Sequence, residues 1–382
     1  MQMKHVFIVG SRGYHVNYGG WETFVSKLVD YYNDKNTIFH ISMITDDKNL
    51  KEYKIGNNII INPIFVKSTS SAKMFFYSIK AFKYYLKYIE KNNFQGCYIY
   101  VLGLKLFNYL SLKRRKIKKL NVNVFVNPDG LEWMRSKWSY PIKKFFLLSE
   151  KLMLNNCDLI VCDGLGIENY IHKKYPHLKN KTVYIAYGYE KFELDKSKFS
   201  SVLEQYNLES DNYILMVGRC VPENNYELVI KEFMRSNIPM KLVIVSNISS
   251  TNYYTNILSK TNCSSDKRIV FIDGIYDSEK LAIIRKNAYA YIHGHSVGGT
   301  NPSLIEAMSL TDLNILYDVC FNHDVGLDTC LYFKDEGSLC DLLNNKKTLD
   351  KLKKDLSKKV KKRVKENFTW DIIVNKYKKI FK

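Results

Sequence analysis

The stretch HGHSVGGTNPSLIEAM, residues 293–308, brings together residue types that suit an anion-binding site. Two histidines and a Gly-Gly pair precede Thr-Asn-Pro-Ser, and an apolar helix carrying one acid, Glu306, is predicted to follow. The first backbone N–H groups of a helix have no partner within the helix, so a helix entered this way can hold a phosphate. An ordinary capped helix after a tight turn has the same appearance, and these residues alone leave both interpretations open.

A second glycine-rich loop follows the first predicted strand, in GSRGYHVNYGGWETFVSKL at 10–28. Glycine lets the backbone approach a ligand closely. The spacing matches neither the GxGxxG dinucleotide fingerprint nor the phosphate loop of ATPases, which weighs against both of those classes. The loop therefore predicts either close contact between backbone and ligand or simply a long turn.

Two more loops carry charged and aromatic side chains. VNPDGLEWMRSKW at 126–138 sets acids beside tryptophans, a combination typical of sugar binding, because aromatic faces cover the apolar side of a sugar ring. A loop held together by its own salt bridges is the alternative. VGRCVPENN at 217–225 places Arg219 at the end of a predicted strand, where a guanidinium can neutralise a pyrophosphate.

Short β-branched runs alternate with helical stretches along the chain, which predicts parallel sheets covered on both faces. The alternation pauses in the polar segment 189–211 and restarts with YILMVGR at 213–219. We expect an α/β protein with two Rossmann-like, doubly wound domains facing a cleft, and a ligand at the carboxyl ends of the strands. The expected ranges are 1–190, 210–365 and a C-terminal helix, 366–382, that crosses back to the first domain.

Composition narrows the class of protein. The chain is 46% apolar and 25% charged, and its apolar runs are too short for a transmembrane helix. Its eight cysteines have no zinc-site spacing and are expected to be reduced residues of a cytoplasmic protein. We expect no metal ion and no cofactor.

The formal net charge of +20 is unevenly distributed, with 13 Lys and Arg against one acid between residues 67 and 119. Such charge attracts phosphate-rich partners. Within it, SAKMFFYSIKAFKYYLKYIEK at 71–91 mixes lysines with aromatic residues at helical spacing, as in a helix lying on an anionic membrane. A helix packed on its own domain is the alternative. Nucleic-acid-binding motifs are absent from the sequence, so we expect no nucleic-acid partner.

These segments, in order and from His5 to the closing FTWDIIVNKY, resemble the GT-B enzymes of glycosyltransferase family 4, and most closely the bacterial rhamnosyltransferase branch that builds capsule and cell-wall polysaccharides. The resemblance implies a metal-independent enzyme that moves L-rhamnose from dTDP-β-L-rhamnose to a lipid-linked saccharide, with retention of configuration. It implies peripheral association with the inner face of the cell membrane. Alternatives are a UDP-sugar donor, a GT-B nucleotide-sugar 2-epimerase, or a basic membrane- or nucleic-acid-binding protein.

The resemblance also implies roles for individual residues. The catalytic residues would be Asp129, Arg219 and Glu306, with Glu306 holding the sugar of the nucleoside. Contacts with the donor and its pyrophosphate would come from Gly19, Gly20, Arg219, Asn224, His293, His295, Gly298, Gly299, Thr300, Asn301, Ser303 and Glu306. Contacts with the acceptor would come from Tyr18, Trp21, Glu22, Asp129, Glu132, Trp133 and Arg135.

Two positions depart from the wider family. Gly298 stands where the first glutamate of the E-x7-E motif is expected, and Asn224 stands where a phosphate-binding lysine is expected. Because that glutamate contacts the transferred sugar in the wider family, we expect His293 or His295 to supply contacts with the donor instead.

Overall fold

The computed structural model describes residues 3–16, 19–67, 73–135 and 138–382, and the chain divides into two compact units. Unit 1 comprises Met1–Tyr187 together with Trp370–Lys382, and unit 2 comprises Gly188–Thr369. The divisions therefore fall after residues 187 and 369. The boundaries expected from the sequence were near 190 and 366.

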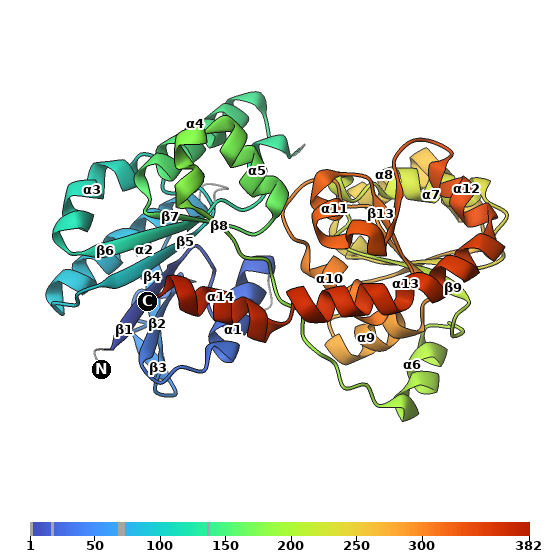
Figure 1. The fold of residues 1–382 in the computed structure, drawn as a ribbon, viewed down its shortest axis with the longest axis horizontal. Coiled ribbons are helices and arrows are strands. Elements are labelled where there is room, and N and C mark those ends of the chain that lie inside the picture. Colours follow the sequence, from blue (N-terminus) through green and yellow to red (C-terminus); the bar gives the residue numbers. More distant parts are fainter. Residues whose placement is uncertain (1–2, 17–18, 68–72, 136–137) are drawn as a thin grey trace. The chain divides into compact units, whose positions relative to one another are not determined.

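Unit 1 is built on one sheet with the strand order β3-β4-β2-β1-β5-β6-β7-β8 (Figure 1). Neighbouring strands are parallel, except that β3 pairs antiparallel with β4. The strands are β1 (Lys4–Val9), β2 (Thr37–Thr45), β3 (Tyr53–Ile55), β4 (Ile59–Phe65), β5 (Cys97–Leu102), β6 (Val122–Asn127), β7 (Leu159–Cys162) and β8 (Thr182–Tyr184).

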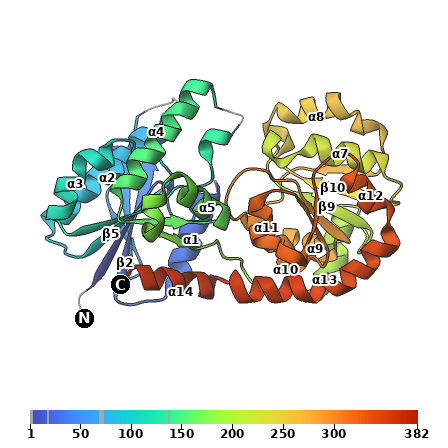
Figure 2. The same ribbon diagram turned by 45° about the horizontal axis from the view of Figure 1, so that its top comes forward.

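The helices of unit 1 cover both faces of this sheet. On one face α1 and α14 lie side by side, and α2, α3 and α4 lie together on the other (Figures 1 and 2). Right-handed crossovers produce this division, because the chain moves across the sheet in opposite directions on either side of β1. The helices are α1 (Gly20–Tyr32), α2 (Lys73–Lys91), α3 (Tyr109–Lys119), α4 (Tyr140–Asn156), α5 (Leu165–Lys174) and α14 (Trp370–Ile380).

Unit 2 has a six-stranded parallel sheet with the order β11-β10-β9-β12-β13-β14. Its strands are β9 (Tyr213–Val217), β10 (Lys241–Val245), β11 (Ile269–Ile272), β12 (Ala290–His293), β13 (Asn314–Tyr317) and β14 (Leu331–Phe333). Its helices are α6 (Phe199–Gln205), α7 (Tyr226–Arg235), α8 (Tyr253–Thr261), α9 (Ser278–Asn287), α10 (Pro302–Leu310), α11 (Cys320–Gly326), α12 (Ser338–Asn344) and α13 (Lys346–Asn367).

The central strands are apolar because helices cover them on both faces. All six residues of β5 are buried, and in unit 2 the inner residues of β9, β10 and β12 join α7 in one hydrophobic core. Twelve short apolar runs predict strands, and each of them forms one: HVFIVG, FHISMIT, NIIINPIF, CYIYVLG, VNVFVNP, DLIVCD, TVYIAYG, YILMVGR, KLVIVS, RIVFIDG, AYAYIHG and LNILYDV. Two strands were not predicted: β3, which is fully exposed and carries no alternating pattern, and the three-residue β14.

The membrane role predicted for residues 71–91 is wrong for the apolar face of α2. That face is buried within unit 1, through residues such as Tyr77, Phe82 and Tyr85. Its exposed side is mainly lysine. Packing on its own domain, the alternative interpretation, is what the structure has. None of the described helices is long and apolar enough to cross a membrane.

Candidate functional site

The strand order of unit 2 reverses direction between β9 and β12, which pair side by side. In a doubly wound sheet, ligands bind outside the carboxyl ends of the strands at such a switch point, because the two following loops diverge there. The loops at this point are 218–225 after β9 and 294–301 after β12. They contain most of the predicted donor-binding residues.

Backbone and side-chain hydrogen bonds join these two loops. The Asn225 amide Nδ2 donates to the Gly294 carbonyl over 2.8 Å, and the Ser296 N–H donates to the Glu223 carbonyl over 2.9 Å. A Cβ atom at Gly294 would lie 2.2 Å from the carbonyl oxygen of Asn224. Only glycine therefore permits the loops to approach this closely.

Asn224 stabilises the site without a charge. Its Nδ2 donates to the Arg219 carbonyl over 2.7 Å, so its Oδ1 is left as an acceptor for Nδ1 of His295, 2.8 Å away. Asn224, which stands where the resemblance implies a lysine, thus connects the two loops and fixes the ring of His295.

Arg219 is a cation at this edge of the sheet, in the loop that follows β9. Its side chain is exposed and forms no hydrogen bond or ion pair with any residue that the structure describes. β9 ends at Val217, and Arg219 follows two residues later. The guanidinium is available to an anion.

The start of α10 differs from the prediction of open N–H groups. Asn301 caps the helix: its Oδ1 accepts from the Ser303 N–H over 3.0 Å, and its carbonyl accepts from the N–H groups of Leu304 and Ile305. Pro302 has no N–H. The N–H donor of Ser303 in the first turn is therefore occupied. A phosphate here would have to displace the Asn301 side chain or bind to the preceding loop. In that loop Thr300 is buried and Gly298 has a φ of +146°.

Arg285, which was not predicted from the sequence, forms an ion pair with Glu306 of α10. Its Nη1 lies 2.6 Å from Oε2 of Glu306, and its Nη2 donates to the Ser303 hydroxyl over 3.0 Å. The arginine is buried, whereas Glu306 remains partly exposed. Sequence gave no signal for this pair, because Arg285 and Lys286 end a helix where basic residues commonly face solvent.

The hydrogen bonds continue from Ser303 to the end of β12. The Tyr291 hydroxyl lies 3.3 Å from Ser303 Oγ, 3.2 Å from the Val217 carbonyl and 3.4 Å from Nδ1 of His293. His293 is buried, and its Nε2 has no partner among the described residues. Burial, with His295 nearby, holds the pKa of His293 well below its ordinary value, so the ring is neutral.

The glycine-rich loop of unit 1 has its own constraints. Gly10 has a φ of +114°, and a Cβ there would lie 2.4 Å from the Leu102 carbonyl oxygen. Glu22, for which the resemblance implied contact with the sugar acceptor, is buried, and its Oε1 accepts from the Arg12 N–H over 2.8 Å, so the carboxylate stabilises the loop. Tyr18 lies outside the described residues.

Among the described residues, no side chain caps the first N–H groups of α1, whereas Asn301 caps α10. Gly19 precedes the helix, and no described side chain caps it. Gly19 and Gly20 are exposed, and a Cβ at Gly20 would meet no atom within 4 Å. Trp21, one residue further, packs edge-on against the rings of Phe24 and Tyr187.

The loop after β6 is held together by its own side chains. Glu132 accepts from Trp138 Nε1 over 2.8 Å and lies 2.8 Å from Arg135 Nε. Arg135 also approaches Asp129 Oδ2, at 3.9 Å. The ring of Trp133 lies under the Lys174 ammonium, 5.7 Å from its centroid. Glu132 and Arg135 therefore form the structural salt bridge that was the alternative to sugar binding, and Asp129 is the acid of this loop with the weaker pairing.

Asp163, at the end of β7, is a second acid that sequence reasoning missed. Its side chain is almost fully buried, and the Tyr187 hydroxyl donates to it. Burial, together with the charge of Asp129, raises the pKa of Asp163 to about 7. Burial raises the pKa of Asp129 as well, although its side chain keeps 30% of its surface exposed and Arg135 opposes the shift. The signal was present in LIVCDG, which repeats the strand-Asp-Gly pattern of FVNPDG on the neighbouring strand.

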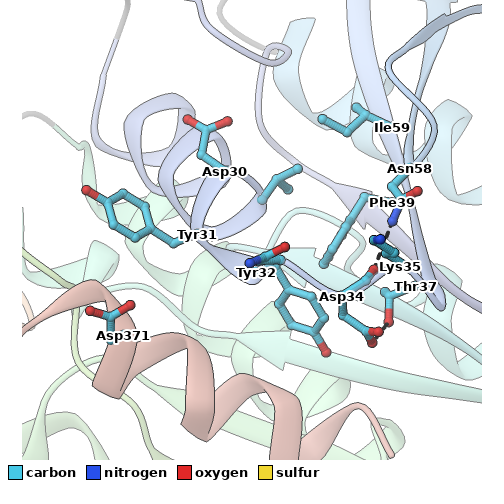
Figure 3. Close-up of a pocket in the computed structure, with 12 residues that line it drawn as sticks. Asp30, Tyr31, Tyr32, Asp34, Lys35, Thr37, Phe39, Asn58, Ile59 and Asp371 are labelled. Atoms are coloured by element: carbon cyan, nitrogen blue, oxygen red, sulfur yellow. Dashed lines mark hydrogen bonds between the residues drawn. The ribbon is translucent and has the colours of Figure 1, made fainter.

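A cavity of about 380 Å³ lies elsewhere in unit 1 (Figure 3). It is formed where α1 ends and β2 begins, and Asp30, Asp34, Thr37, Asn58 and Asp371 are among its lining residues. This is the amino end of the strand, opposite the edge that carries Asp129 and Asp163. None of the predicted site residues lines this cavity, so we do not assign the chemistry to it.

Comparison with known proteins gives one family model and several relatives. The model described as a domain of unknown function (DUF1972) matches residues 3–190. An uncharacterized glycosyltransferase of Methanocaldococcus jannaschii is 23% identical over 407 residues, which cover 99% of each chain.

Solved structures resemble the chain over its whole length. Sucrose-phosphate synthase from Thermosynechococcus elongatus matches with a TM-score of 0.77 and 17% identity, covering 100% of this chain and 98% of that one. Anabaena HepE in complex with UDP matches with a TM-score of 0.70 and 10% identity, covering 100% and 99%. Together with the two parallel-sheet units, these matches confirm the expected architecture: the chain has the GT-B fold.

Proposed function

We propose that this chain is a glycosyltransferase that moves a sugar from a nucleotide-sugar donor bound on unit 2 to a hydroxyl group of an acceptor bound on unit 1. The observation that carries the proposal is the β9–β12 switch point, where two loops are joined by hydrogen bonds. Beside these loops lie Arg219, which has no partner among the described residues, and Glu306, which Arg285 orients. Two facts about relatives support it. The M. jannaschii relative is described as a glycosyltransferase, and HepE, with the same fold, has been solved with UDP and with UDP-glucose.

The two charged residues would bind different parts of the donor. Arg219, with no protein partner among the described residues, suits the pyrophosphate. Glu306 has only Oε2 engaged by Arg285, so Oε1 can accept hydrogen bonds from hydroxyl groups of the nucleoside's sugar. Arg285 acts here as a positioning residue, because it fixes the carboxylate that would contact the ligand.

The proposed reaction is a front-side displacement with retention of configuration and without a metal ion. The bond between the anomeric carbon and the pyrophosphate oxygen breaks as the acceptor oxygen bonds to the same face of that carbon. The acceptor's proton passes to the departing phosphate. Arg219 stabilises the negative charge that develops on the leaving group, which is the kind of contribution that dominates such catalysis. Asp129 would orient the acceptor hydroxyl.

For the donor we propose L-rhamnose carried by dTDP, and for the acceptor a lipid-linked saccharide at the inner face of the membrane. The basis is the resemblance of the loops at 10–28, 126–138, 217–225 and 293–308 to the rhamnosyltransferase branch, including Gly298 and Asn224. A UDP-sugar is the second candidate donor, and the UDP and UDP-glucose complexes of HepE favour it.

The first test measures release of nucleoside diphosphate from dTDP-rhamnose, UDP-glucose and UDP-N-acetylglucosamine, each with and without a lipid-pyrophosphate glucose acceptor. Acceptor-dependent release is expected from one donor. Conversion of a donor to its 2-epimer without an acceptor would instead indicate an epimerase. Absence of turnover with every donor and acceptor, from a chain that binds the nucleotides, would contradict the proposal.

The second test replaces Arg219 by alanine. Loss of one preorganised group that stabilises the leaving charge is expected to lower kcat/KM by about 100- to 1000-fold. Arg235→Ala is the matched control, because Arg235 is also an exposed arginine of unit 2 but lies at the far end of α7. If Arg219→Ala kept kcat/KM within a few-fold of wild type while Arg235→Ala behaved identically, Arg219 would have no role in the leaving-group site.

A further inference from the structure

The carboxyl edge of the sheet in unit 1 brings two aspartates together from neighbouring strands. Val126 of β6 pairs with Ile160 of β7, and an aspartate stands three residues after each of them, Asp129 and Asp163. Neighbouring strands of a sheet lie about 4.8 Å apart. The two carboxyl groups therefore belong to the same part of this edge, and the charge of Asp129 acts on Asp163.

The end of β6 holds Asp129 in place. Its φ of +64° lies in the left-handed region, which aspartate tolerates better than most residues. Its N–H donates to Oδ1 of Asn127 over 2.8 Å, and Nδ2 of Asn127 donates to the Tyr100 hydroxyl, 3.5 Å away. That hydroxyl lies 2.9 Å from the hydroxyl of Tyr377 in α14. A buried chain of polar groups thus fixes the loop at Asp129, whose own side chain keeps 30% of its surface exposed.

Asp163 is the buried member of the pair. It is 2% exposed, and the Tyr187 hydroxyl donates to it. Burial, and then the charge of Asp129, raise its pKa to about 7. Because the neighbouring titratable groups named next are neutral or negative, none of them offsets a charge on its carboxyl group. These groups are Asp129, Tyr187, Tyr100, Tyr377 and Cys162.

Asp129, in contrast, has cations beside it. Burial raises the pKa of Asp129, whereas the charges of Arg135 and Lys105 lower it. Nη2 of Arg135 lies 3.9 Å from Oδ2 of Asp129, and Nε of the same arginine lies 2.8 Å from Oε2 of Glu132. When two neighbouring carboxyl groups share one proton, their surroundings decide which of them holds it. Here the negative charge is best placed on Asp129 and the proton on Asp163.

We propose that Asp163 is a positioning residue of the acceptor site, whose protonated carboxyl group lets Asp129 meet the acceptor hydroxyl as the ionised member of the pair. This inference rests on the proposed function. Asp163 is too buried to touch the acceptor, so it acts through Asp129. The proton of the acceptor still passes to the departing phosphate, and Asp163 keeps its own. If Asp163 ionises, two carboxylates repel each other across neighbouring strands, and Asp129 no longer holds the acceptor correctly.

A purely structural role for Asp163 predicts a different behaviour. To accept the hydrogen bond of Tyr187, a side chain needs an oxygen atom but no proton. The ionised carboxylate, the protonated carboxyl group and the amide of asparagine all supply that oxygen. Only a positioning role makes sugar transfer depend on which form is present. The two roles therefore differ in the pH dependence of transfer.

The test measures kcat/KM for lipid-pyrophosphate glucose between pH 6 and pH 8.5, with the donor that the wild type uses. The wild type is expected to lose about 30-fold over this range, because the protonated fraction of Asp163 falls by about that factor. Asp163→Asn cannot ionise, so it is expected to lack this decline and to stay within about threefold of wild type at pH 6. The KM for the donor, which is proposed to bind on unit 2, should not change.

Tyr187→Phe tests the same carboxyl group without replacing it. The hydrogen bond from Tyr187 lowers the pKa of Asp163, so its removal is expected to move the decline in kcat/KM to higher pH. Asp158→Asn is the matched control. Asp158 immediately precedes the opposite end of β7, where Arg114 pairs with it, and its replacement should leave the wild-type pH dependence unchanged.

Three results would overturn the inference while leaving the transferase proposal intact. They are a wild type that shows no decline at alkaline pH, an Asp163→Asn variant that declines as the wild type does, and an equal effect of Asp158→Asn. If Asp163→Asn does not fold, Tyr187→Phe decides, because a decline that stays at the same pH in that variant also overturns the inference. Absence of turnover by the wild type at every pH would contradict the proposed function, and the inference would fall with it.

Discussion

Replacing Asp163 by asparagine tests whether burial raises the pKa of this carboxyl group in unit 1 as far as its surroundings indicate. The carboxyl group is almost fully buried at the end of β7, and burial beside Asp129 raises its pKa from 3.8 to about 7. In the unfolded chain the same group is solvated. As pH rises, the unfolded chain therefore loses this proton first, and the free energy of unfolding falls between about pH 4 and pH 7.

The size of the effect follows from the difference of the two pKa values. A difference of about 3 units corresponds to about 4 kcal/mol once both states are ionised. About 1.7 kcal/mol of this is already lost at pH 5, where the unfolded state is mostly ionised, so about 2.5 kcal/mol remains to be lost between pH 5 and pH 8. Asparagine keeps an acceptor for the Tyr187 hydroxyl but has no proton to lose, so its stability should lack this pH dependence.

Urea titrations at pH 5 and pH 8, followed by tryptophan fluorescence, can isolate the effect. All four tryptophans, Trp21, Trp133, Trp138 and Trp370, lie in unit 1, so their emission reports on the unit that contains Asp163. Asp47→Asn, at an exposed position of the same unit, is the control. Relative to wild type, Asp163→Asn should gain about 2.5 kcal/mol in the free energy of unfolding between pH 5 and pH 8.

An unchanged difference between wild type and Asp163→Asn across that range would refute the reasoning, because it would mean that Asp163 stays ionised in the folded chain. A gain of equal size in Asp47→Asn would place the pH dependence in general charge repulsion of the +20 chain instead. An effect present in the Asp163 variant alone would establish a carboxyl group that can hold a proton near neutral pH, beside the acid proposed to face the acceptor.

Two further predictions concern unit 2. Arg285→Met removes the cation that orients Glu306. We expect calorimetry to show about tenfold weaker binding of the preferred nucleoside diphosphate, and the free energy of unfolding of unit 2 to fall by about 1 to 3 kcal/mol. Unchanged affinity would mean that Arg285 has a structural role only. Gly294→Ala forces a Cβ to within 2.2 Å of the Asn224 carbonyl, and should lower the stability of unit 2 by about 2 kcal/mol or more in calorimetric scans, whereas Gly20→Ala, which meets open space, should not.

Much of the fold could be read from sequence because parallel strands are buried on both faces. Runs such as CYIYVL and KLVIV have no polar side to hide, and each became a central strand. Strands outside that environment escaped the pattern: β3 lies at the sheet edge with all three residues exposed. The same limit applies to α2. Its lysines and its aromatic residues could be recognised in the sequence at helical spacing, but the sequence did not show which surface the aromatic residues pack against.

The candidate site divides along a related line. The loops that meet at the switch point could be predicted, because each follows an apolar run that predicts a strand and each is rich in glycine and polar residues. Pairing across the fold could not. Arg285 reaches Glu306 from a helix that precedes it by some twenty residues, and Asp163 joins Asp129 from the next strand. No sequence spacing identifies the contact between Arg285 and Glu306, and the strand-Asp-Gly pattern that Asp163 shares with Asp129 was the sequence signal for the second pair.

The starts of α1 and α10 show that residue types at a predicted anion site do not determine whether its N–H groups are free or capped. Both α1 and α10 follow glycine-containing loops for which the resemblance implied contacts with the donor, and open N–H groups were predicted at the start of α10. At α10 the side chain of Asn301 occupies the N–H donor that a phosphate would use, whereas the N-cap of α1 is Gly19, which has no side chain to do so. Asparagine is both a polar group that can face a ligand and an effective N-cap, and the cap is the closer partner. A phosphate at the start of α10 must therefore compete with Asn301. Arg219 has no partner among the described residues, so the binding energy should depend most on this residue.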